Sequence, residues 1–235
     1  MSSEAENRST AYKSIQSITD AIRPVSIVEE GSGGMSPSGT ACIVADGARR
    51  FVLTSHHVVS GPQSKYFGVD GKGSTRWPPR YSRLAARSQG LPEADVAWAV
   101  ADGETNAIDL GPSIPFAQAS AVVPDTDGAT YLAVGFPVSK SKMRDARTLL
   151  AAKQAVVSAT LCEDSVYLTL RLDKRVQMAL SYSQSDRTDL LSEPAVGPNP
   201  TGMSGGAVVA LLTAVTTKGT LTFPVVVGIL THFHL

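Results

Sequence analysis

The sequence predicts an all-β protein made of many short strands and preceded by one helix. After Pro24, short apolar runs alternate with Gly, Pro and Asp turn residues, which is typical of a β-barrel or a β-sandwich. In one run, Val166, Leu168, Leu170 and Leu172 alternate with less apolar residues, which is the period of a half-buried strand. The other predicted strands are Ala41–Val44, Phe51–Thr54, Val96–Val100, Ala129–Val134, Ala155–Ala159, Gly206–Leu212 and Phe223–Leu230, and Lys218-Gly219 can turn a hairpin between the last two.

The predicted helix lies at the N-terminus. Ala11, Ile15, Ile18 and Ile22 recur at intervals of four, three and four positions, which places them on one face of an amphipathic helix. Pro24 is expected to end this helix. We therefore interpret residues 1–24 as a helical extension that packs on the main body.

Composition and charge argue against several classes of function. The 235 residues include 21 basic and 21 acidic side chains and no basic run, so the sequence predicts no nucleic-acid partner. The longest apolar stretches, such as Ala207–Val215, are too short to cross a membrane. Met1–Ser9 lacks the basic start and apolar core of a secretory signal. Together these features predict a cytoplasmic protein with no membrane partner.

The two cysteines, Cys42 and Cys162, are too few for a disulfide framework. We expect both to be thiols in a reducing cytoplasm. Cys42 could alternatively be a nucleophile. It lies in Thr40–Val44, however, an apolar run that predicts a buried strand.

The first motif that carries chemistry is Gly202-Met203-Ser204-Gly205-Gly206. A serine hydroxyl becomes a nucleophile when a base takes its proton, and the oxyanion formed by its attack needs backbone N–H donors. Flanking glycines permit the tight backbone that points such donors inward, although a plain glycine-rich turn has the same composition. The motif also fits the nucleophile elbow of α/β-hydrolases, in which the acid and the histidine follow the serine. No Asp or Glu follows Ser204, so we reject the elbow.

Partners that precede the serine must follow the order histidine, acid, serine. The segment Leu53-Thr54-Ser55-His56-His57-Val58-Val59 supplies two histidines directly after an apolar strand. Alone, either histidine would be interpreted as structural, but its position ahead of a G-x-S-G-G site favours a catalytic role. Asp95 is the preferred acid because it opens a clean apolar run, Val96–Val100. Acids such as Asp102 lie in turn-like surroundings, whereas the acid of a triad must be buried enough to orient an imidazole.

Six blocks, in the right order, resemble those of trypsin-like serine peptidases. Val52–Val59 resembles the L-T-A-A-H-V-V block, in a register that assigns the catalytic role to His57 and leaves His56 as a neighbour. The other five blocks are Gly39–Val44 (with Ala41 in place of a glycine), Ala94–Val100, Gly202–Gly206, Val227–Thr231 and Gly135–Pro137, the last being similar to a turn common in bacterial members. The resemblance covers roughly residues 25–235.

The resemblance implies a single peptidase domain with two six-stranded antiparallel β-barrels of the chymotrypsin type, over about 25–115 and about 116–235. Only four residues follow Thr231, so the second barrel is expected to lack its last strand. We expect a downstream part of a longer protein, a partner or a second copy to supply that edge.

The resemblance also implies the roles of individual residues. His57 would act as general base and acid, Asp95 would orient it, and Ser204 would form an acyl-enzyme. The backbone N–H groups of Gly202 and Ser204 would form the oxyanion hole. Thr231 would bond the buried carboxylate.

The sequence says less about cleavage specificity. The residues after Thr231, His232 and Phe233, would line the substrate groove, and the bulky Phe233 stands where members with deep pockets have glycine. A narrowed pocket would favour small apolar substrate residues. Pro198 stands where trypsin-like members carry an aspartate, inside Ser183–Thr201, a mostly polar stretch that predicts a long surface loop, so no preference for Arg or Lys is supported.

His232 and His234 lie two positions apart, and such a pair can bind zinc. No third ligand lies nearby in the sequence, so we predict no metal, and we also predict no cofactor.

The sequence thus predicts a serine endopeptidase acting on proteins or peptides. One alternative is a catalytically silent trypsin-like module that binds peptides, although such modules usually lose a triad residue and all three are present here. A second alternative is an effector that stays inactive until a regulatory domain or partner orders its oxyanion loop.

Overall fold

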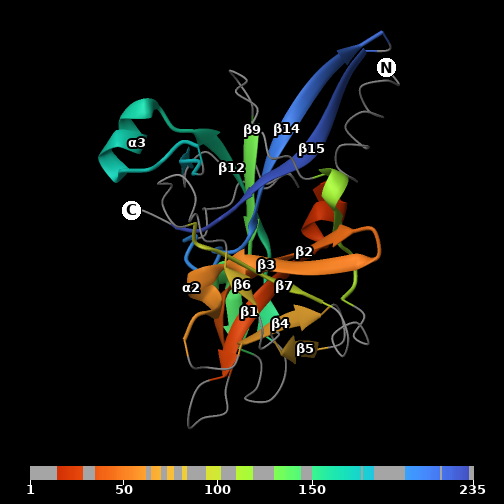
Figure 1. Ribbon diagram of the computed structural model, residues 1–235, viewed down its shortest axis with the longest axis vertical. Helices are drawn as coiled ribbons and strands as arrows, with labels where there is room; N and C mark the ends of the chain where they lie inside the picture. Colours follow the sequence, from red (N-terminus) through yellow and green to blue (C-terminus); the bar gives the residue numbers. More distant parts are fainter. Residues whose placement is uncertain are drawn as a thin grey trace.

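The computed structural model describes residues 15–28, 35–61, 65–69, 73–76, 81–83, 94–101, 110–118, 130–143, 150–175, 177–182, 199–217 and 219–232. The chain forms two main sheets, largely antiparallel, with few helices (Figure 1). Strands of the first sheet lie between Ile22 and Pro115, and strands of the second lie between Thr130 and Ile229. This arrangement confirms the predicted fold class, an all-β protein with two antiparallel β units.

The first sheet has eight strands in the order β5-β4-β1-β2-β3-β7-β6, with β8 paired to β2. Its core is a cluster of small and branched apolar side chains that includes Val25, Ile43 and Val52. The strands are β1 (Ile22–Val28), β2 (Met35–Asp46), β3 (Arg49–Ser55), β4 (Lys65–Val69), β5 (Gly73–Arg76), β6 (Ser82–Arg83), β7 (Val96–Val100) and β8 (Ile114–Pro115). The short helix α2 (His56–Val59) follows β3 directly.

The second sheet has five strands in the order β13-β12-β9-β14-β15. They are β9 (Thr130–Gly135), β12 (Ala155–Leu161), β13 (Leu180–Ser181), β14 (Ala207–Thr216) and β15 (Gly219–Ile229). A separate pair is formed by β10 (Ser141–Met143) and β11 (Leu150–Ala152). The remaining helices are α3 (Asp164–Leu170) and the 3₁₀ turns η2 (Phe116–Gln118) and η3 (Val138–Lys140).

Seven of the eight predicted runs are strands, and β7 and β12 show the alternating burial of a strand with one face on a core. In β12, Ala155, Val157 and Ala159 are buried while the residues between them are half-buried, as expected for a strand with one face on a core. The predicted hairpin is also present, because β14 and β15 stay paired up to Thr216 and Gly219. Lys218, which was expected in its turn, lies outside the described residues.

The sheets differ from two six-stranded barrels in strand number and closure. The first has eight strands and the second five, and neither ladder closes on itself within the described residues. The strand β15 ends the order of the second sheet, so one of its edges has no partner strand in the part of the chain that the structure describes. That open edge agrees with the expectation of an incomplete second barrel.

The N-terminal helix is present but ends earlier than predicted. Residues 15–19 are helical, whereas Pro24 lies inside β1 and faces Thr40 of β2. The chain leaves the helix at Asp20-Ala21 because Ile22 already pairs with Cys42 as the first residue of β1. The prediction that Pro24 ends the helix was therefore wrong. Pro24 lies within a strand, where its fixed φ is tolerated.

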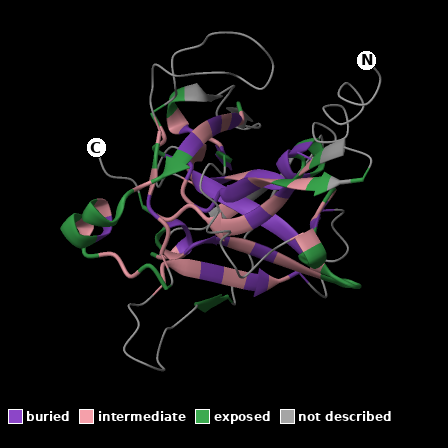
Figure 2. Cartoon of the chain, turned by 90° about the horizontal axis from the view of Figure 1, so that it is seen from above, coloured by how far each residue is buried: buried purple, intermediate pink, exposed green. Residues whose placement is uncertain are grey.

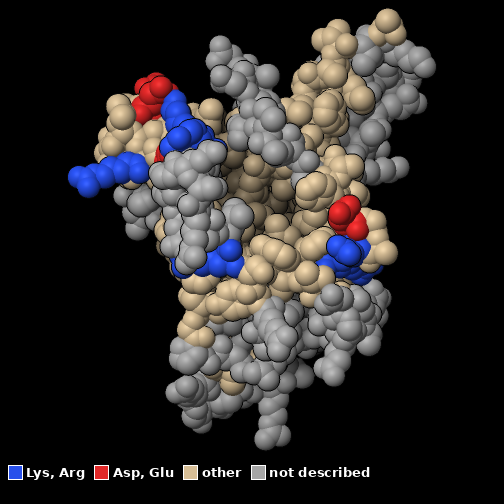
Figure 3. Space-filling model, viewed as in Figure 1, with Lys and Arg blue, Asp and Glu red and all other residues tan. Residues whose placement is uncertain are grey.

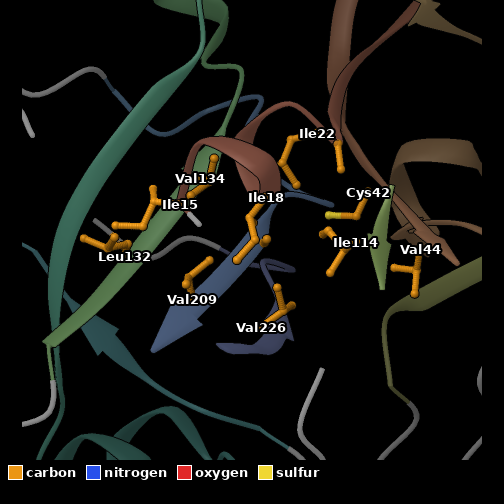
Figure 4. Close-up of a cluster of buried hydrophobic side chains, with 12 residues drawn as sticks. Ile15, Ile18, Ile22, Cys42, Val44, Ile114, Leu132, Val134, Val209 and Val226 are labelled. Carbon is orange, nitrogen blue, oxygen red and sulfur yellow. The ribbon is translucent and has the colours of Figure 1, made fainter. Parts of the chain in front are cut away.

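The apolar face of this helix fills the space between the two sheets. Ile15, Ile18 and Ile22 are buried in one cluster with Cys42, Val44 and Ile114 of the first sheet and with Leu132, Val134, Val209 and Val226 of the second (Figure 4). Ala21 and Ala207 complete the cluster. The segment thus packs on the main body as predicted, with its apolar face in the core and with Gln16 and Ser17 exposed.

The predicted strand over Val166–Leu172 is wrong, because the structure has the helix α3 there. Val166, Tyr167 and Leu170 turn inward and Leu168 is 80% exposed, which is the spacing of a helical face rather than a strand face. Asp164 in the first turn suits a helix N-terminus, and the Tyr167 hydroxyl accepts a hydrogen bond from the Ala179 amide. The period of two was not decisive here, because Val166 and Leu170 also fit one face of a helix.

Burial and charge on the surface follow this arrangement. Buried residues run along the strands of both sheets, and α3 is mostly exposed (Figure 2). On the face seen in Figure 3, the coloured charged side chains form small separate groups of both signs. Two ion pairs, Lys174–Asp164 and Arg175–Asp173, involve residues in α3 or within five positions of its end. None of the described helices is long and apolar enough to span a membrane.

Candidate active site

The register of two strands brings His57 and Asp95 together. The strands β3 and β7 are antiparallel, and Ser55, the last residue of β3, faces Val96, the first of β7. The residues that follow β3 therefore lie at the same end of this strand pair as the residue that precedes β7. Val58 and Val59 are buried and anchor α2 on the core, so the short helix holds His57 beside Asp95.

Three hydrogen bonds join the two segments. The His56 amide donates to the Asp95 carbonyl oxygen at 3.1 Å, and the His57 amide donates to Asp95 Oδ1 at 3.0 Å. His57 Nδ1 lies 2.5 Å from Asp95 Oδ2. An ionised carboxylate only accepts, so Nδ1 is the donor and Nε2 of the neutral ring keeps a lone pair. This is the tautomer that a general base requires.

The two side chains differ in exposure as their roles would need. The Asp95 side chain is 14% exposed and the His57 side chain is 47% exposed. The carboxylate is thus largely withdrawn from water while one side of the imidazole remains open to a reaction partner. This difference favours an orienting role for Asp95 and a proton-transfer role for His57.

Ser204 lies in the loop that leads into β14, and β2 of the first sheet holds that loop. The Thr40 amide donates to the Ser204 carbonyl oxygen at 2.8 Å, and Thr40 Oγ1 donates to the Gly202 carbonyl oxygen at 2.9 Å. Cys42 Sγ donates to the Gly205 carbonyl oxygen at 3.3 Å. The loop around Ser204 (the serine loop) is therefore continuous with β14 of the second sheet and is hydrogen-bonded to β2 of the first sheet.

The carbonyl oxygen of Leu230, at the end of β15, ties the serine loop to the histidine segment. It accepts from the Gly205 amide at 2.6 Å and from Ser55 Oγ at 2.7 Å. Because Ser55 directly precedes α2, one acceptor fixes both the loop that carries Ser204 and the start of the helix that carries His57.

Gly39 allows the serine loop and α2 to approach each other closely. A Cβ at this position would lie 2.6 Å from Val58 Cγ2 and 3.0 Å from the Ser204 carbonyl oxygen. The Ser204 carbonyl and Val58, the neighbour of His57, therefore both lie against Gly39 where another residue would have its Cβ. No hydrogen bond joins His57 to Ser204 within the described residues.

The backbone around Ser204 leaves two N–H groups available. Gly202 and Gly205 have φ values of +92° and +88°, a region in which residues with a Cβ are strained. Met203, Gly205 and Gly206 donate their amides to Pro200, Leu230 and Met203. Among the described residues, neither the Gly202 nor the Ser204 amide has a protein acceptor. These are the two N–H groups predicted to form an oxyanion hole.

The residues after β15 depart from expectation. Thr231 makes no hydrogen bond with Asp95 in the described structure, so the predicted contact with the carboxylate is absent. His57 uses both Asp95 oxygens, and His232 Nε2 lies 3.9 Å from Oδ2. The rings of His232 and His57 are 5.7 Å apart between centroids. His232 therefore lies beside the histidine–aspartate pair, where it was expected only to line a groove. Phe233 lies outside the described residues, and so does Pro198.

Sequence reasoning missed three positioning groups, Thr40, Ser55 and the Leu230 carbonyl. Thr40, Thr54 and Ser55 are all fully buried or nearly so, and each hydroxyl donates to a backbone carbonyl. A hydroxyl inside an apolar strand needs such a partner, which is the signal that could have found Thr40 and Ser55. The role of the Leu230 carbonyl could not have been predicted, because every residue has a backbone carbonyl and the residue type does not mark it.

Cys42 is a structural thiol rather than a nucleophile. It is fully buried, and burial raises the pKa of its thiol far above the usual value because the thiolate would lose its hydration. Neither Cys42 nor Cys162 is in a disulfide, and Cys162 is partly exposed. At a pH near neutrality, a raised thiol pKa leaves almost no thiolate at Cys42, and the thiolate is the reactive form.

We therefore expect alkylation with iodoacetamide at about pH 8 to label Cys162 alone in the native protein. Both thiols should be labelled in urea, which exposes Cys42. Mass spectrometry of the digested protein measures each site. The Cys162→Ser variant should remain unlabelled until it is unfolded, and rapid native labelling of Cys42 would contradict its burial.

Comparisons with known proteins were made for the sequence and for the structure. No family model matches the sequence, and no curated protein is significantly similar to it. Similar solved structures include the HtrA-type protease AlgW with a decapeptide, at 14% identity and a TM-score of 0.45, covering 92% of this chain and 63% of that chain. Neuropsin, a serine protease expressed in mouse brain, has 13% identity and a TM-score of 0.45 over 91% of both chains. A serine endoprotease from Yersinia pestis has 14% identity and a TM-score of 0.43, covering 90% of this chain and 61% of that chain.

The topology of the chain itself decides the fold. The first sheet carries the histidine–aspartate pair, and the second carries the serine loop at the junction of the two. The chain has a chymotrypsin-type fold. It spans less than two thirds of the length of the two bacterial-type proteases given above, AlgW and the Yersinia enzyme. At identities this low, the likeness concerns the fold and not the activity.

Proposed function

We propose that the protein is a serine endopeptidase with His57, Asp95 and Ser204 as its catalytic triad. The observation that carries the proposal is the contact between His57 Nδ1 and Asp95 Oδ2, 2.5 Å apart, at the sheet junction where the Ser204 loop is held. A largely shielded carboxylate that fixes the tautomer of a half-exposed imidazole has little structural value at the ends of two strands. It has a direct chemical use if that imidazole removes a proton from a serine.

The reaction follows from these groups. His57 Nε2 takes the proton of Ser204 Oγ as the oxygen attacks the carbonyl carbon of the scissile peptide bond. Asp95 stabilises the imidazolium that forms, and the Gly202 and Ser204 amides donate to the oxyanion. His57 then gives the proton to the leaving amine, which leaves an acyl-enzyme on Ser204. Water, activated by the same imidazole, hydrolyses the acyl-enzyme and restores the serine.

The open edge of β15 supports a peptide as substrate. This strand ends at Ile229 beside the site, and its outer edge has no partner strand among the described residues. An unpaired edge offers backbone donors and acceptors to an extended peptide. We place the enzyme in the cytoplasm on the strength of its thiols, since neither Cys42 nor Cys162 is in a disulfide.

A second candidate is an enzyme that needs activation by a regulatory domain or partner. The observation in its favour is that His57 and Ser204, both described, share no hydrogen bond. In free enzymes this bond is often long and tightens only when substrate binds, so its absence does not count against the triad itself. A silent peptide-binding module would have no use for the tautomer that Asp95 fixes.

Labelling with a fluorophosphonate probe tests the proposal without knowledge of the substrate. The probe reacts with a serine whose proton is removed by a neighbouring base, so we expect labelling of the wild-type protein at Ser204. The Ser204→Ala variant should not be labelled. Mass spectrometry of the modified peptide identifies the site.

The matched control is Ser165→Ala, which removes an exposed hydroxyl in α3, outside the site. This variant should still be labelled at Ser204 because, within the described residues, Ser165 makes no hydrogen bond with the histidine, the aspartate or the Ser204 loop. Equal labelling of wild type and Ser204→Ala, or modification at another serine, would show that Ser204 is not the nucleophile. Labelling that occurs only after addition of a partner would favour the activated enzyme.

A further inference from the structure

Three side chains that can bind a metal converge at the edge of the site. One nitrogen each of His57 and His232 and one oxygen of Asp95 all lie within 4.8 Å of one another. They come from three segments that are distant in the sequence: α2, the residue before β7, and the residues after β15. The sequence offered His232 no third ligand nearby, and the fold supplies both His57 and Asp95.

The separations of these atoms suit a small tetrahedral ion. Bonds of about 2.0 Å to nitrogen and oxygen put neighbouring ligand atoms about 3.3 Å apart around zinc. His57 Nδ1 and Asp95 Oδ2 are 2.5 Å apart, and His232 Nε2 and Asp95 Oδ2 are 3.9 Å apart, so the two distances lie on either side of that value. The His232 side chain is 59% exposed and the His57 side chain is 47% exposed, so neither ring is locked by packing.

The chemistry of the set also favours zinc. Two imidazoles and one carboxylate are ligands of borderline softness, which zinc prefers over the all-oxygen sets of calcium and magnesium. Three protein ligands leave a fourth position for water, and the exposure of both histidines gives that water access.

We propose that His57, Asp95 and His232 form an inhibitory zinc site. Zinc binds between Asp95 Oδ2 and the two imidazoles. As the ion takes the place of the proton on His57 Nδ1, solvent returns a proton to Nε2, so the ring stays a neutral ligand. The His57–Asp95 hydrogen bond is thereby replaced by two metal–ligand bonds. His232 then moves towards the pair by a small rotation of an exposed side chain.

Zinc bound in this way would keep His57 from serving as a base, because Nε2 then carries the ring proton and has no free lone pair. The consequence for catalysis rests on the proposed function, but the binding itself does not. Under that function, zinc and proton transfer compete for the same imidazole, so inhibition is reversible and is relieved by a chelator. His232 is the residue that would make the site, because the other two ligands belong to the triad.

Calorimetric titration of the protein with zinc alone tests the binding directly. We expect one ion per chain in the wild type and in Ser204→Ala, since the serine is not a ligand. In His232→Ala the affinity should fall at least about 10-fold, because even changes beside a metal ligand have effects of that size. The matched control is His56→Ala, which removes a histidine whose ring faces Tyr81 at 6.0 Å instead of Asp95. This variant should keep the wild-type affinity.

Probe labelling with and without zinc supplies the second measurement. For each protein the ratio of the two labelling rates is compared, so that differences in basal reactivity cancel. Zinc should slow labelling of the wild type and of His56→Ala, with recovery after EDTA, and should have at least about 10-fold less effect on His232→Ala.

The possible failures can be told apart. Zinc binding of one ion per chain that requires His232, in a protein that the probe never labels, would uphold the site and overturn the peptidase. Normal labelling with no zinc binding, or with binding unchanged in His232→Ala, would overturn the zinc site alone.

Discussion

Replacement of His57 by alanine should lower kcat/KM by about three to four orders of magnitude if the triad is correct. The change removes the base that takes the serine proton and also the acid that protonates the leaving amine. It leaves the backbone intact, because the His57 amide can still donate to Asp95 Oδ1. The effect should fall on kcat rather than on KM, since the imidazole acts mainly in the transition state.

His56→Ala is the matched control for this prediction. His56 is the neighbouring residue in the same helix, and its own link to Asp95 is made by the backbone amide, which alanine retains. We expect kcat/KM to stay within a few fold of the wild-type value. Hydrolysis of a peptide pool, followed by mass spectrometry, gives the rates, and thermal unfolding checks that both variants fold. An inactive His56→Ala beside an active His57→Ala would mean that the register of the histidine segment is wrong by one.

Gly205→Ala should unfold the junction of the two sheets. A Cβ at Gly205 would lie 1.9 Å from the Thr40 carbonyl oxygen and 2.2 Å from Thr54 Oγ1, and both atoms belong to the first sheet. The glycine also has a φ of +88°. Relief of the clash must separate the serine loop from β2, which breaks the bonds that Thr40 and Cys42 make to it. We expect the free energy of unfolding to fall by about 4 kcal/mol or more, a large part of the stability of an ordinary domain.

Gly61→Ala separates the clash from the backbone strain. Gly61 has a φ of +99°, close to that of Gly205, but a Cβ there would meet nothing within 4 Å. This variant should lose only about 1–2 kcal/mol, the cost of a left-handed conformation for alanine. Urea denaturation gives both free energies. A difference between the two variants below about 1 kcal/mol would mean that the sheets part easily at this point, against the packing described above.

Local pattern predicted much of the architecture, because strands and their partners leave a signal in the sequence. The runs at Phe51–Thr54 and Val96–Val100 became β3 and β7, and their antiparallel register then placed His57 beside Asp95. The motif around Ser204 was predicted from the chemistry of acyl transfer and lies where both sheets hold it. These features depend on burial and on short-range order, which a single sequence records.

Features that depend on distant neighbours were not predicted. The helix α3 was not predicted because its apolar residues fit the period of a strand as well as that of a helix. Only the fold decides between the two. Likewise, no pattern in the sequence indicates that His232 rather than Thr231 approaches Asp95, since that depends on how the chain leaves β15. The helix at residues 15–19 was expected to pack on the main body, and it does. That both sheets contribute to the cluster beneath it was not predicted, because amphipathicity says which face is buried and not what covers it.

The position of that helix has a consequence for the cooperativity of folding. Ile15, Ile18 and Ile22 contribute to one apolar cluster that also contains side chains from both sheets (Figure 4). Neither sheet can bury its share of this cluster fully until the other sheet and the helix are in place. Burial of the cluster therefore stabilises the helix and both sheets together. As a result, folding of the sheet that carries His57 is coupled to folding of the sheet that carries Ser204. Loss of the N-terminal segment would weaken this coupling without removing any residue of the site, so the distance between base and nucleophile depends on a part of the chain that contacts neither.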